Sequence, residues 1–404
     1  MLSFLLNQTL IVALSLSALF PSAEQIDDAT RSAVAYFKAV AVSISANAQR
    51  NTEKQNAEQQ GFGTRRIDRQ APNTNLQGSS NSNRQQQGVD RHRHSRYFVA
   101  GSRRAVQVGS YRDLPAGQPL SQEPGASYYF FKTLYGSRVH LVVIDIDSAA
   151  WDLRPAVNAT VDTTTHSAQA RSAAATVNGG YFGLSDGASV SYVIVDGKEE
   201  ASPRRNSSLL ANSRLSRSTK DAIYNRSEMR ILVSSSGKNE VVVAHHDEAI
   251  PNGFMLLHSL QAGPRLLPDL NTEKEAFVRQ ENGKTVDVIR SRQMVARTAF
   301  GVTADRRVLL VCVEGGEEQQ GRGGATLIQL RQLMLDLGCV EALNLDGGSS
   351  STMYVSYPDS QGRSVGHTVC RNNPERRVKS VLLLLKKKQQ SGKIKVPSVQ
   401  KRCK

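Results

Sequence analysis

Residues 326–352 read TLIQLRQLMLDLGCVEALNLDGGSSST, and they hold the strongest local signals of the chain. Thr326 and Gln329 form the T-x-x-Q pattern of a helix capping box, and apolar residues follow at three- and four-residue spacing. Gly338 suits the end of that helix, and the apolar run 342–345 follows directly as a strand. A helix that leads straight into a strand predicts a helix packed on a β-sheet.

This strand ends in a group of residues that suits ligand binding. Asp346 follows it, then Gly347 and Gly348, then four hydroxyl residues from Ser349 to Thr352. Two glycines let a ligand approach the backbone, and a carboxylate with hydroxyls can recognise sugar hydroxyls and phosphate. The alternative is an Asp-Gly turn with solvated serines.

A second glycine-rich segment leads into the helix. It begins at Glu314, Gly315 and Gly316 and ends at Gly323 and Gly324, just before the capped helix. Backbone N–H groups and the helix dipole favour an anionic group there. A flexible loop without a ligand is the alternative.

Outward from these segments, the chain after Tyr111 alternates strands and turns. The run 138–147 predicts a strand, and hairpins are expected over 191–200, 231–245 and 301–314. The continuous apolar run 378–385 predicts a last strand that is buried on both faces. The expected fold class is α+β, a single catalytic domain with a mixed, largely antiparallel β-sheet core and few helices.

Charge separates this domain from the ends of the chain. The net charge of the 404 residues is +15, but residues 111–385 carry 30 basic and 29 acidic side chains. Residues 24–110 carry 13 basic and 7 acidic side chains, and residues 386–404 carry 8 basic and none acidic. We therefore expect no specific nucleic-acid partner, and only non-specific polyanion contact through the basic tail 386–404. A solvated tail without a partner is the alternative.

The N-terminal third predicts export and disorder. Leu10–Phe20 suits the apolar core of a signal peptide over residues 1–23, although no Lys or Arg precedes it. An uncleaved anchor or a buried helix stays open, and no other segment is apolar enough to span a membrane. Residues 24–110 predict one short amphipathic helix near residues 34–44 and then a polar, Asn/Gln-rich, largely disordered extension. We expect a secreted or cell-envelope protein.

Four cysteines allow at most two disulfides. Cys312 and Cys339 flank the predicted helix, so we expect them to approach closely enough for a bridge in an oxidising compartment. Cys403 lies in the basic tail and is expected to stay free or to pair between chains.

Two other motifs give weaker evidence, one for a serine nucleophile and one for a metal site. Residues 183–187 match the G-x-S-x-G pattern of serine hydrolases, but a strand-like segment follows instead of the required helix. His245, His246 and Asp247 are metal-ligand types, yet adjacent strand residues point to opposite faces. We predict no metal and no cofactor.

Six segments in order resemble the phosphodiester glycosidase family over roughly residues 139–385. They are Asn178–Phe182, Gln261–Leu267, Arg297–Gly301, Glu314–Gly315 with Gly324–Leu327, Asn344–Thr352, and Asn373–Pro374 with Arg376–Val378. The chain departs from the family where Gly316 stands in place of an expected arginine, unless Arg322 substitutes for it.

The resemblance implies a hydrolase that frees a sugar from a sugar-1-phosphodiester by C–O cleavage, with a phosphomonoester as leaving group. Asp346 would act as base or nucleophile, Glu314 as the second carboxyl, and Arg297 as the phosphate clamp. The expected substrate-binding residues are Asn178, Gly180, Gln261, Arg297, Thr326, Asn344, Gly347, Gly348, Ser349, Ser350 and Thr352. The alternatives are a phosphodiesterase or nuclease that cleaves P–O, and a glycan- or wall-binding protein without catalysis.

Overall fold

A computed structural model describes residues 96–99, 105–107, 109–133, 136–281, 283–315 and 323–387. Several predictions fall outside these residues: the signal peptide over 1–23, the helix near 34–44, nearly all of the polar extension, Arg322, and the tail beyond Lys387 with Cys403. These remain predictions.

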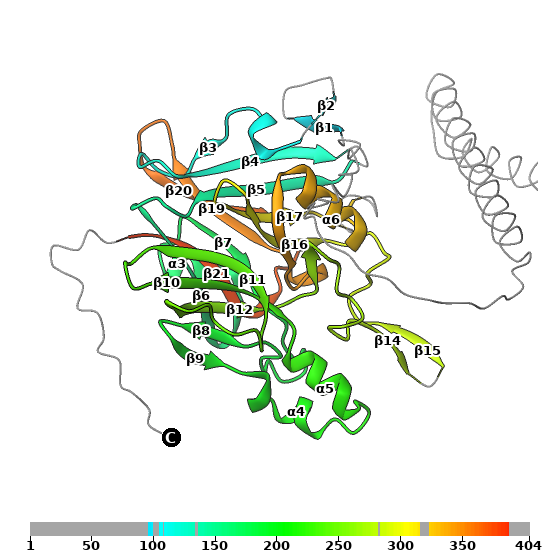
Figure 1. The fold of residues 1–404 in the computed structure, drawn as a ribbon. Coiled ribbons are helices and arrows are strands. Elements are labelled where there is room, and N and C mark those ends of the chain that lie inside the picture. The colour runs from blue at the N-terminus through cyan, green and yellow to red at the C-terminus, as the bar shows by residue number, and fades with distance from the viewer. Residues whose placement is uncertain are drawn as a thin grey trace, which may run out of the picture. The chain divides into compact units, whose positions relative to one another are not determined.

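The largest sheet has nine strands in the order β13-β18-β16-β17-β5-β4-β1-β2, with β3 paired to β4 (Figure 1). The strands are β1 (Arg96–Val99), β2 (Ala105–Gln107), β3 (Gln118–Pro119), β4 (Ala126–Thr133), β5 (Arg138–Asp145), β13 (Arg265–Leu267), β16 (Arg297–Thr303), β17 (Arg307–Val313) and β18 (Cys339–Asn344). The predicted strand over 138–147 and the hairpin over 301–314 are present as β5 and β16–β17.

Three smaller sheets complete the strands. One has the order β20-β19-β7-β21-β6, another has the order β11-β10-β12-β8-β9, and β14–β15 is a separate hairpin. The strands are β6 (Trp151–Thr163), β7 (Ala175–Asn178), β8 (Val193–Val195), β9 (Lys198–Ala201), β10 (Ser227–Ser234), β11 (Asn239–His245), β12 (Phe254–Gln261), β14 (Val278–Glu281), β15 (Lys284–Asp287), β19 (Met353–Pro358), β20 (Ser364–Cys370) and β21 (Arg377–Lys386). Hairpins β8–β9 and β10–β11 match those predicted over 191–200 and 231–245.

Helices are few among the described residues. They are α3 (Thr164–Ala170), α4 (Ser207–Ala211), α5 (Arg217–Tyr224) and α6 (Leu327–Asp336), with the 3-10 turns η1 (Tyr111–Asp113), η2 (Pro203–Arg205) and η4 (Gly348–Ser350). The capping box of Thr326 and Gln329 forms as predicted, and Gly338 takes a positive φ of 87° after the helix ends. In the described part of the chain, no helix is both long and apolar enough to cross a membrane.

All strand pairs in the described residues are antiparallel, which agrees with the predicted α+β class. The sheet begins earlier than the predicted boundary at residue 111, because β1 pairs with β4 and β2 pairs with β1. The end of the 24–110 segment is therefore part of the sheet. Strands of four and three residues are too short for an alternating pattern to stand out in the sequence.

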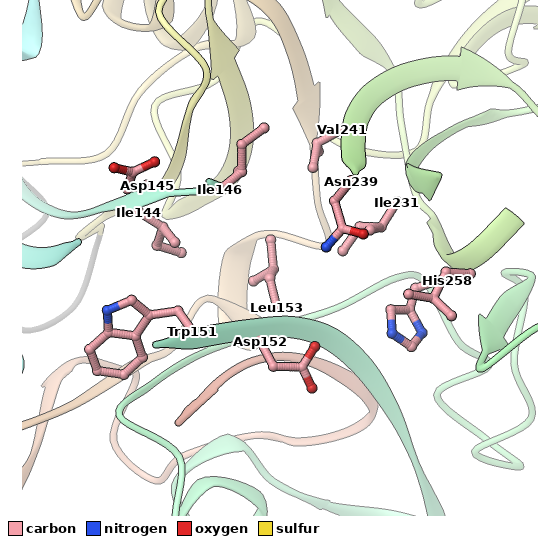
Figure 2. Close-up of a pocket in the computed structure, with 11 residues that line it drawn as sticks. Ile144, Asp145, Ile146, Trp151, Asp152, Leu153, Ile231, Asn239, Val241 and His258 are labelled. Atoms are coloured by element: carbon pink, nitrogen blue, oxygen red, sulfur yellow. The ribbon is translucent and has the colours of Figure 1, made fainter. Parts of the chain in front are cut away.

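A small cavity lies between the sheets, lined among others by Trp151, Leu153, Ile231 and His258 (Figure 2). His258 is fully buried, and this burial lowers its pKa to about 4. The cavity volume of about 30 Å³ is close to that of one water molecule, so it is too small for a sugar.

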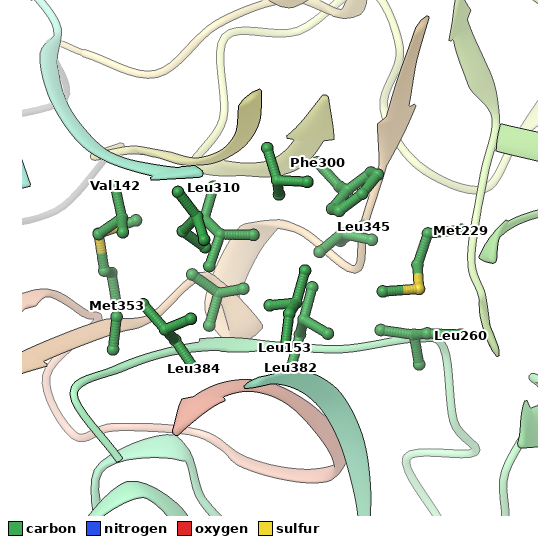
Figure 3. Close-up of a cluster of buried hydrophobic side chains, with 14 of the residues drawn as sticks. Val142, Leu153, Met229, Leu260, Phe300, Leu310, Leu345, Met353, Leu382 and Leu384 are labelled. Atoms are coloured by element: carbon green, nitrogen blue, oxygen red, sulfur yellow. The ribbon is translucent and has the colours of Figure 1, made fainter. Parts of the chain in front are cut away.

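The rest of the space between the sheets is filled by one apolar core (Figure 3). Leu310 and Phe300 come from the nine-stranded sheet, Leu382 and Met353 from the β21 sheet, and Met229 from the β10 sheet. The opposite face of the nine-stranded sheet is covered by α6 through its buried leucines and Met334. As predicted, β21 is buried on both faces at 381–384.

The predicted Cys312–Cys339 bridge is wrong. Cys312 on β17 is bonded to Cys370 at the end of β20, with their Cα atoms 6.5 Å apart, and Cys339 is a buried thiol. The side chains of Cys312 and Cys370 belong to the core between the sheets, whereas Cys339 lies in the core under α6. The two faces of the sheet therefore separate Cys339 from Cys312. Burial raises the pKa of the Cys339 thiol.

Candidate active site

The two proposed catalytic carboxylates follow the C-terminal ends of two strands of the nine-stranded sheet. Strands β17 and β18 both pair antiparallel with β16, so they run in the same direction. Glu314 directly follows β17, and Asp346 follows β18 by two residues. One strand separates them, which corresponds to about 10 Å between their backbones. The sheet topology thus brings these two predicted residues to the same end of the domain.

Asp346 is a half-buried carboxyl held by the backbone. Its N–H donates to the Gly179 carbonyl at 3.1 Å, and the Gly347 N–H donates to its Oδ1 at 3.0 Å. Burial raises the pKa of Asp346 to about 6, opposed in part by the Ser350 hydroxyl, the Gly347 N–H and the charge of Arg376. This carboxyl changes its charge near neutral pH, as an acid–base group requires.

The glycines after Asp346 bring the loop against β16. The Gly348 N–H donates to the Ala296 carbonyl at 2.8 Å, and Gly348 has a positive φ of 59°. A Cβ atom on Gly347 would lie 3.2 Å from that same carbonyl, so a side chain there is tightly restricted. The loop leaves Ser349 exposed and turns Ser350 inward beside Asp346.

Glu314 takes part in a buried polar network. Its Oε1 lies 2.6 Å from His140 Nε2, and its Oε2 lies 3.4 Å from Arg138 Nη1. His140 is bonded in turn, through Nδ1, to the Tyr128 hydroxyl at 2.8 Å. Both ring nitrogens of His140 are therefore engaged, and the histidine fixes the position of the Glu314 carboxyl. Burial raises the pKa of Tyr128, so its hydroxyl stays protonated.

Asn178 joins three parts of the site. Its Nδ2 donates to the Asp346 carbonyl at 2.6 Å, and its Oδ1 accepts bonds from the Thr298 hydroxyl at 2.7 Å and the Thr352 N–H at 3.1 Å. It is fully buried. Asn178 thus positions the loop of Asp346 rather than presenting its amide to a ligand.

Asn344 leaves one polar atom without a partner. Its Nδ2 donates to the carbonyls of Gly263 and Leu345 and lies 2.9 Å from the Tyr181 hydroxyl. Its Oδ1, like the hydroxyls of Ser351 and Thr352, is buried and has no hydrogen-bond partner among the described residues. Unpaired buried polar atoms are costly, so the segment that holds Asp346 is not optimised for stability alone.

The structure does not place Arg297 as the predicted phosphate clamp. Arg297 is 1% exposed, and its guanidinium donates to four backbone carbonyls, those of Ala325, Ile289, Arg290 and Gln293. Four of its five N–H groups thus tie a loop and the start of α6 to β16. Its charge is satisfied by peptide dipoles in the interior, where a free phosphate cannot reach it.

Three other predicted binding residues have local structural roles. The Gln261 side chain is fully buried and bonded to the backbone of Tyr192, Tyr224 and Arg226. Gly180 is needed because a Cβ atom there would collide with the Gln261 carbonyl. The Thr326 hydroxyl accepts the Gln329 N–H as the α6 cap, on the helix-covered face of the sheet. These three predicted contacts to a substrate have no support in this geometry.

One arginine not singled out from the sequence lies beside Tyr181, which contacts the segment before Asp346. Arg226 is 5% exposed, its Nε donates to the Glu275 carbonyl at 3.0 Å, and its Cζ lies 3.7 Å from the Phe277 ring centroid. Its two Nη groups donate to no described residue. Burial lowers the pKa of Arg226 to about 10, so it stays cationic. Tyr181 links it to the site, since its ring lies 5.6 Å from the Arg226 Cζ and its hydroxyl 3.4 Å from the Leu345 carbonyl.

A sequence signal existed for some of the missed residues. His140 stands on the same face of β5 as Val142 and Ile144, and a polar residue on a buried apolar face is informative. Arg376 is exposed, and its charge acts on Asp346. It lies in one of the matched segments, next to Arg377 and Val378 of β21. No motif distinguishes Arg226.

In the described residues, no group of three or more His, Cys, Asp or Glu side chains could hold a metal ion. The weak motifs gain no support either. Ser185 lies in an exposed turn, without a following helix that would make it a nucleophile elbow. His246 is bonded to Glu228, while His245 contacts Asn225.

A family model described as phosphodiester glycosidase matches residues 171–385, which is more than half of the chain. No curated protein sequence matches the chain. Among solved structures, a hypothetical protein from Synechocystis is 16% identical with a TM-score of 0.42, covering 64% of this chain and 62% of its own. The chain thus spans less than two thirds of that protein.

Two further structures are similar. The catalytic domain of zebrafish N-acetylglucosamine-1-phosphodiester alpha-N-acetylglucosaminidase, auto-inhibited by its pro-peptide, is 17% identical with a TM-score of 0.44, covering 70% of this chain and 88% of that one. A putative exported protein from Burkholderia pseudomallei is 18% identical with a TM-score of 0.42, covering 64% of this chain and 74% of that one.

Proposed function

The chain belongs to the phosphodiester glycosidase family, and from this premise we propose that it hydrolyses a sugar-1-phosphodiester. Water replaces the phosphate at C1, the C1–O bond breaks, and the products are a free sugar and a phosphomonoester. The observation that carries the proposal is Asp346, a half-buried carboxyl with a pKa near 6 beside two glycines at a strand end.

Asp346 is proposed as the base that activates water or as the nucleophile at C1. Both roles need the ionised form, which predominates above pH 6. Glu314 is the second carboxyl, held by His140 and Arg138. A phosphate leaving group is already a stable anion, so protonation by Glu314 contributes less than in ordinary glycosidases.

Arg226 and Arg376 are proposed as the phosphate-binding residues in place of Arg297. Arg226 offers two Nη groups without partners among the described residues, and a planar guanidinium binds phosphate in a bidentate way. Arg376 is exposed and close enough to lower the pKa of Asp346. The sugar hydroxyls would meet exposed Ser349, which directly follows the two glycines.

Turnover in water labelled with oxygen-18 tests this reaction, with an N-acetylglucosamine phosphodiester as substrate. Label in the sugar supports C–O cleavage. Label in the phosphate would identify a phosphodiesterase or nuclease, and binding without turnover would identify a non-catalytic glycan-binding protein. Aryl glycosides serve as the matched comparison, because they lack the phosphate and should be poor substrates.

We also propose that the protein acts outside the cytosol, at the cell envelope or secreted. The Cys312–Cys370 disulfide supports this location, because such bonds persist in oxidising compartments. Intact-mass analysis of native protein tests it. Processing near Glu24 together with a disulfide is expected, whereas an unprocessed Met1 with four free thiols would contradict export.

A further inference from the structure

A second cavity, of about 530 Å³, lies beside α5 and the turn that follows β11. Figure 1 shows α5 at one end of the β11-β10-β12-β8-β9 sheet. The cavity volume falls in the range of small-molecule sites. Its lining includes none of the residues proposed for catalysis or for substrate binding around Asp346. The cavity therefore has to be explained separately.

One wall of this pocket is the His246 ring, which stacks on Tyr192 behind it. The His246 ring lies parallel to the Tyr192 ring, with 3.8 Å between centroids and an interplanar angle of 4°. His246 Nδ1 lies 2.8 Å from a carboxylate oxygen of Glu228, which is itself buried and paired with Arg230. These contacts fix the orientation of the ring, and Nε2 has no partner among the described residues. A histidine oriented by a buried carboxylate is typical of binding sites.

Arg204 extends the wall with a positioned cation. Its Nε donates to the Tyr192 hydroxyl at 2.8 Å, and its Cζ lies 4.2 Å from the Tyr224 ring centroid. Its Nη groups donate to no described residue. Lys274, also exposed, lines the same pocket and likewise has no bonded partner among the described residues. The guanidinium is thus held ready for an anion at little entropic cost.

Carboxylates complete the lining. Asp221 and Asp247 are exposed and face the same pocket as the cations. An ionised carboxylate only accepts hydrogen bonds, so it suits hydroxyl groups and disfavours a bare anion. A ligand that pairs with the two cations and also bonds to the two carboxylates carries an anionic group and hydroxyls.

We propose that this pocket binds a sugar phosphate. Arg204 and Lys274 hold the phosphate, His246 Nε2 bonds to the ligand, and Asp221 and Asp247 accept sugar hydroxyls. The inference goes beyond the proposed hydrolysis and does not depend on it, because the two sites share no residue.

Calorimetric titration of the full chain with glucose 6-phosphate tests the proposal, with glucose and inorganic phosphate as the comparison ligands. We expect glucose 6-phosphate to bind at least ~10-fold more tightly than either fragment. Arg204→Ala should weaken that binding by at least ~10-fold. The matched control is Arg205→Ala, since Arg205 is also exposed but is bonded to Glu199 and does not line the pocket.

Lys274→Gln is a second variant at an exposed position, so it keeps the test valid if Arg204→Ala fails to fold. It should also weaken binding. Equal affinities in the Arg204 and Arg205 variants, or inorganic phosphate binding as tightly as the sugar phosphate, would overturn the proposal. Loss of binding in Asp346→Asn would also overturn it, because the ligand would then occupy the catalytic site.

Discussion

Asp346 combines a proposed catalytic role with a cost in stability. Burial raises its pKa from 3.8 to about 6, so the native state holds the proton more tightly than the unfolded chain. Above pH 6 both states are ionised, and the native state bears the full cost of the charge. This cost is about 3 kcal/mol by linkage, and it shrinks as the pH falls through 6 toward 4.

We therefore predict that Asp346→Asn lowers kcat by at least ~10³ and stabilises the fold at pH 8 by up to about 3 kcal/mol. The gain in the free energy of unfolding should be smaller at pH 4.5. In the unmodified protein, kcat/KM should rise with pH up to about 6 and then level. Denaturant unfolding at both pH values and a pH–rate profile measure these effects.

Asp359→Asn is the matched control, because Asp359 lies in the turn between β19 and β20 and is bonded there to the exposed Arg363. It should leave turnover unchanged. Near-normal turnover in folded Asp346→Asn would remove Asp346 from the catalytic role.

The two buried arginines should respond differently to substitution. Arg226→Met keeps the packing on Phe277 but removes the charge, so we predict a loss of about 10² in kcat/KM on the phosphodiester. Its residual activity on a neutral aryl glycoside should be unchanged. Arg297→Lys cannot replace four guanidinium bonds, and we predict a loss of about 2–4 kcal/mol in the free energy of unfolding.

Steady-state kinetics on both substrates, together with thermal unfolding, distinguish these roles. A stable Arg297→Lys protein that has lost only phosphodiester turnover would restore Arg297 as the phosphate clamp. Equal loss on both substrates in Arg226→Met would argue against phosphate recognition by Arg226.

At the level of elements, the disulfide joins β17, which leads to Glu314, to the end of β20. The bond closes a loop with a sequence separation of 58 residues. Chain-entropy arguments give about 4 kcal/mol for a loop of this length. We predict that Cys370→Ser, or reduction with dithiothreitol, lowers stability by about 2–4 kcal/mol and reduces activity by loosening the strand end that positions Glu314.

Thermal unfolding with and without reductant measures this contribution. The matched control is Cys339→Ala, which removes a buried thiol that takes part in no disulfide. That variant should keep its response to reductant, whereas Cys370→Ser should lose it. A Cys370→Ser protein as stable as the parent would show that the bond does not form or does not constrain the fold.

For the whole molecule, we predict that residues 95–387 suffice for the chemistry. Removing residues 24–94 and 388–404 should leave kcat/KM on a small soluble substrate within a few-fold and weaken any salt-dependent adhesion to polyanions. Removal of residues 24–110 should instead lower the free energy of unfolding, because this truncation deletes β1 and β2 and exposes the edge of β4. Kinetics and unfolding of the two truncated proteins measure the difference.

Failure of the 95–387 protein to fold would show that the polar extension or the tail contributes to the core. Equal stability of the two truncations would show that the β1–β2 hairpin adds nothing to the sheet.

Local patterns in the sequence determined most elements of this protein. The capping box at Thr326, the apolar run before Lys386 and the turn glycines all act through neighbours within a few residues, so they predicted α6, β21 and the hairpins β8–β9 and β10–β11. Asp346 could also be singled out, because a strand end, a carboxylate and two glycines are consecutive.

Only the tertiary structure decided how side chains distant in sequence are paired. Whether Arg297 faces a ligand or four carbonyls depends on which loop covers it, and only the fold brings Arg226 against Phe277 and Tyr181. The disulfide partner of Cys312 followed from which face of the sheet each cysteine occupies. The disulfide spans 58 residues, and even the short-range bonds of Arg297 depend on an irregular loop, so no periodic spacing in the sequence encodes these contacts.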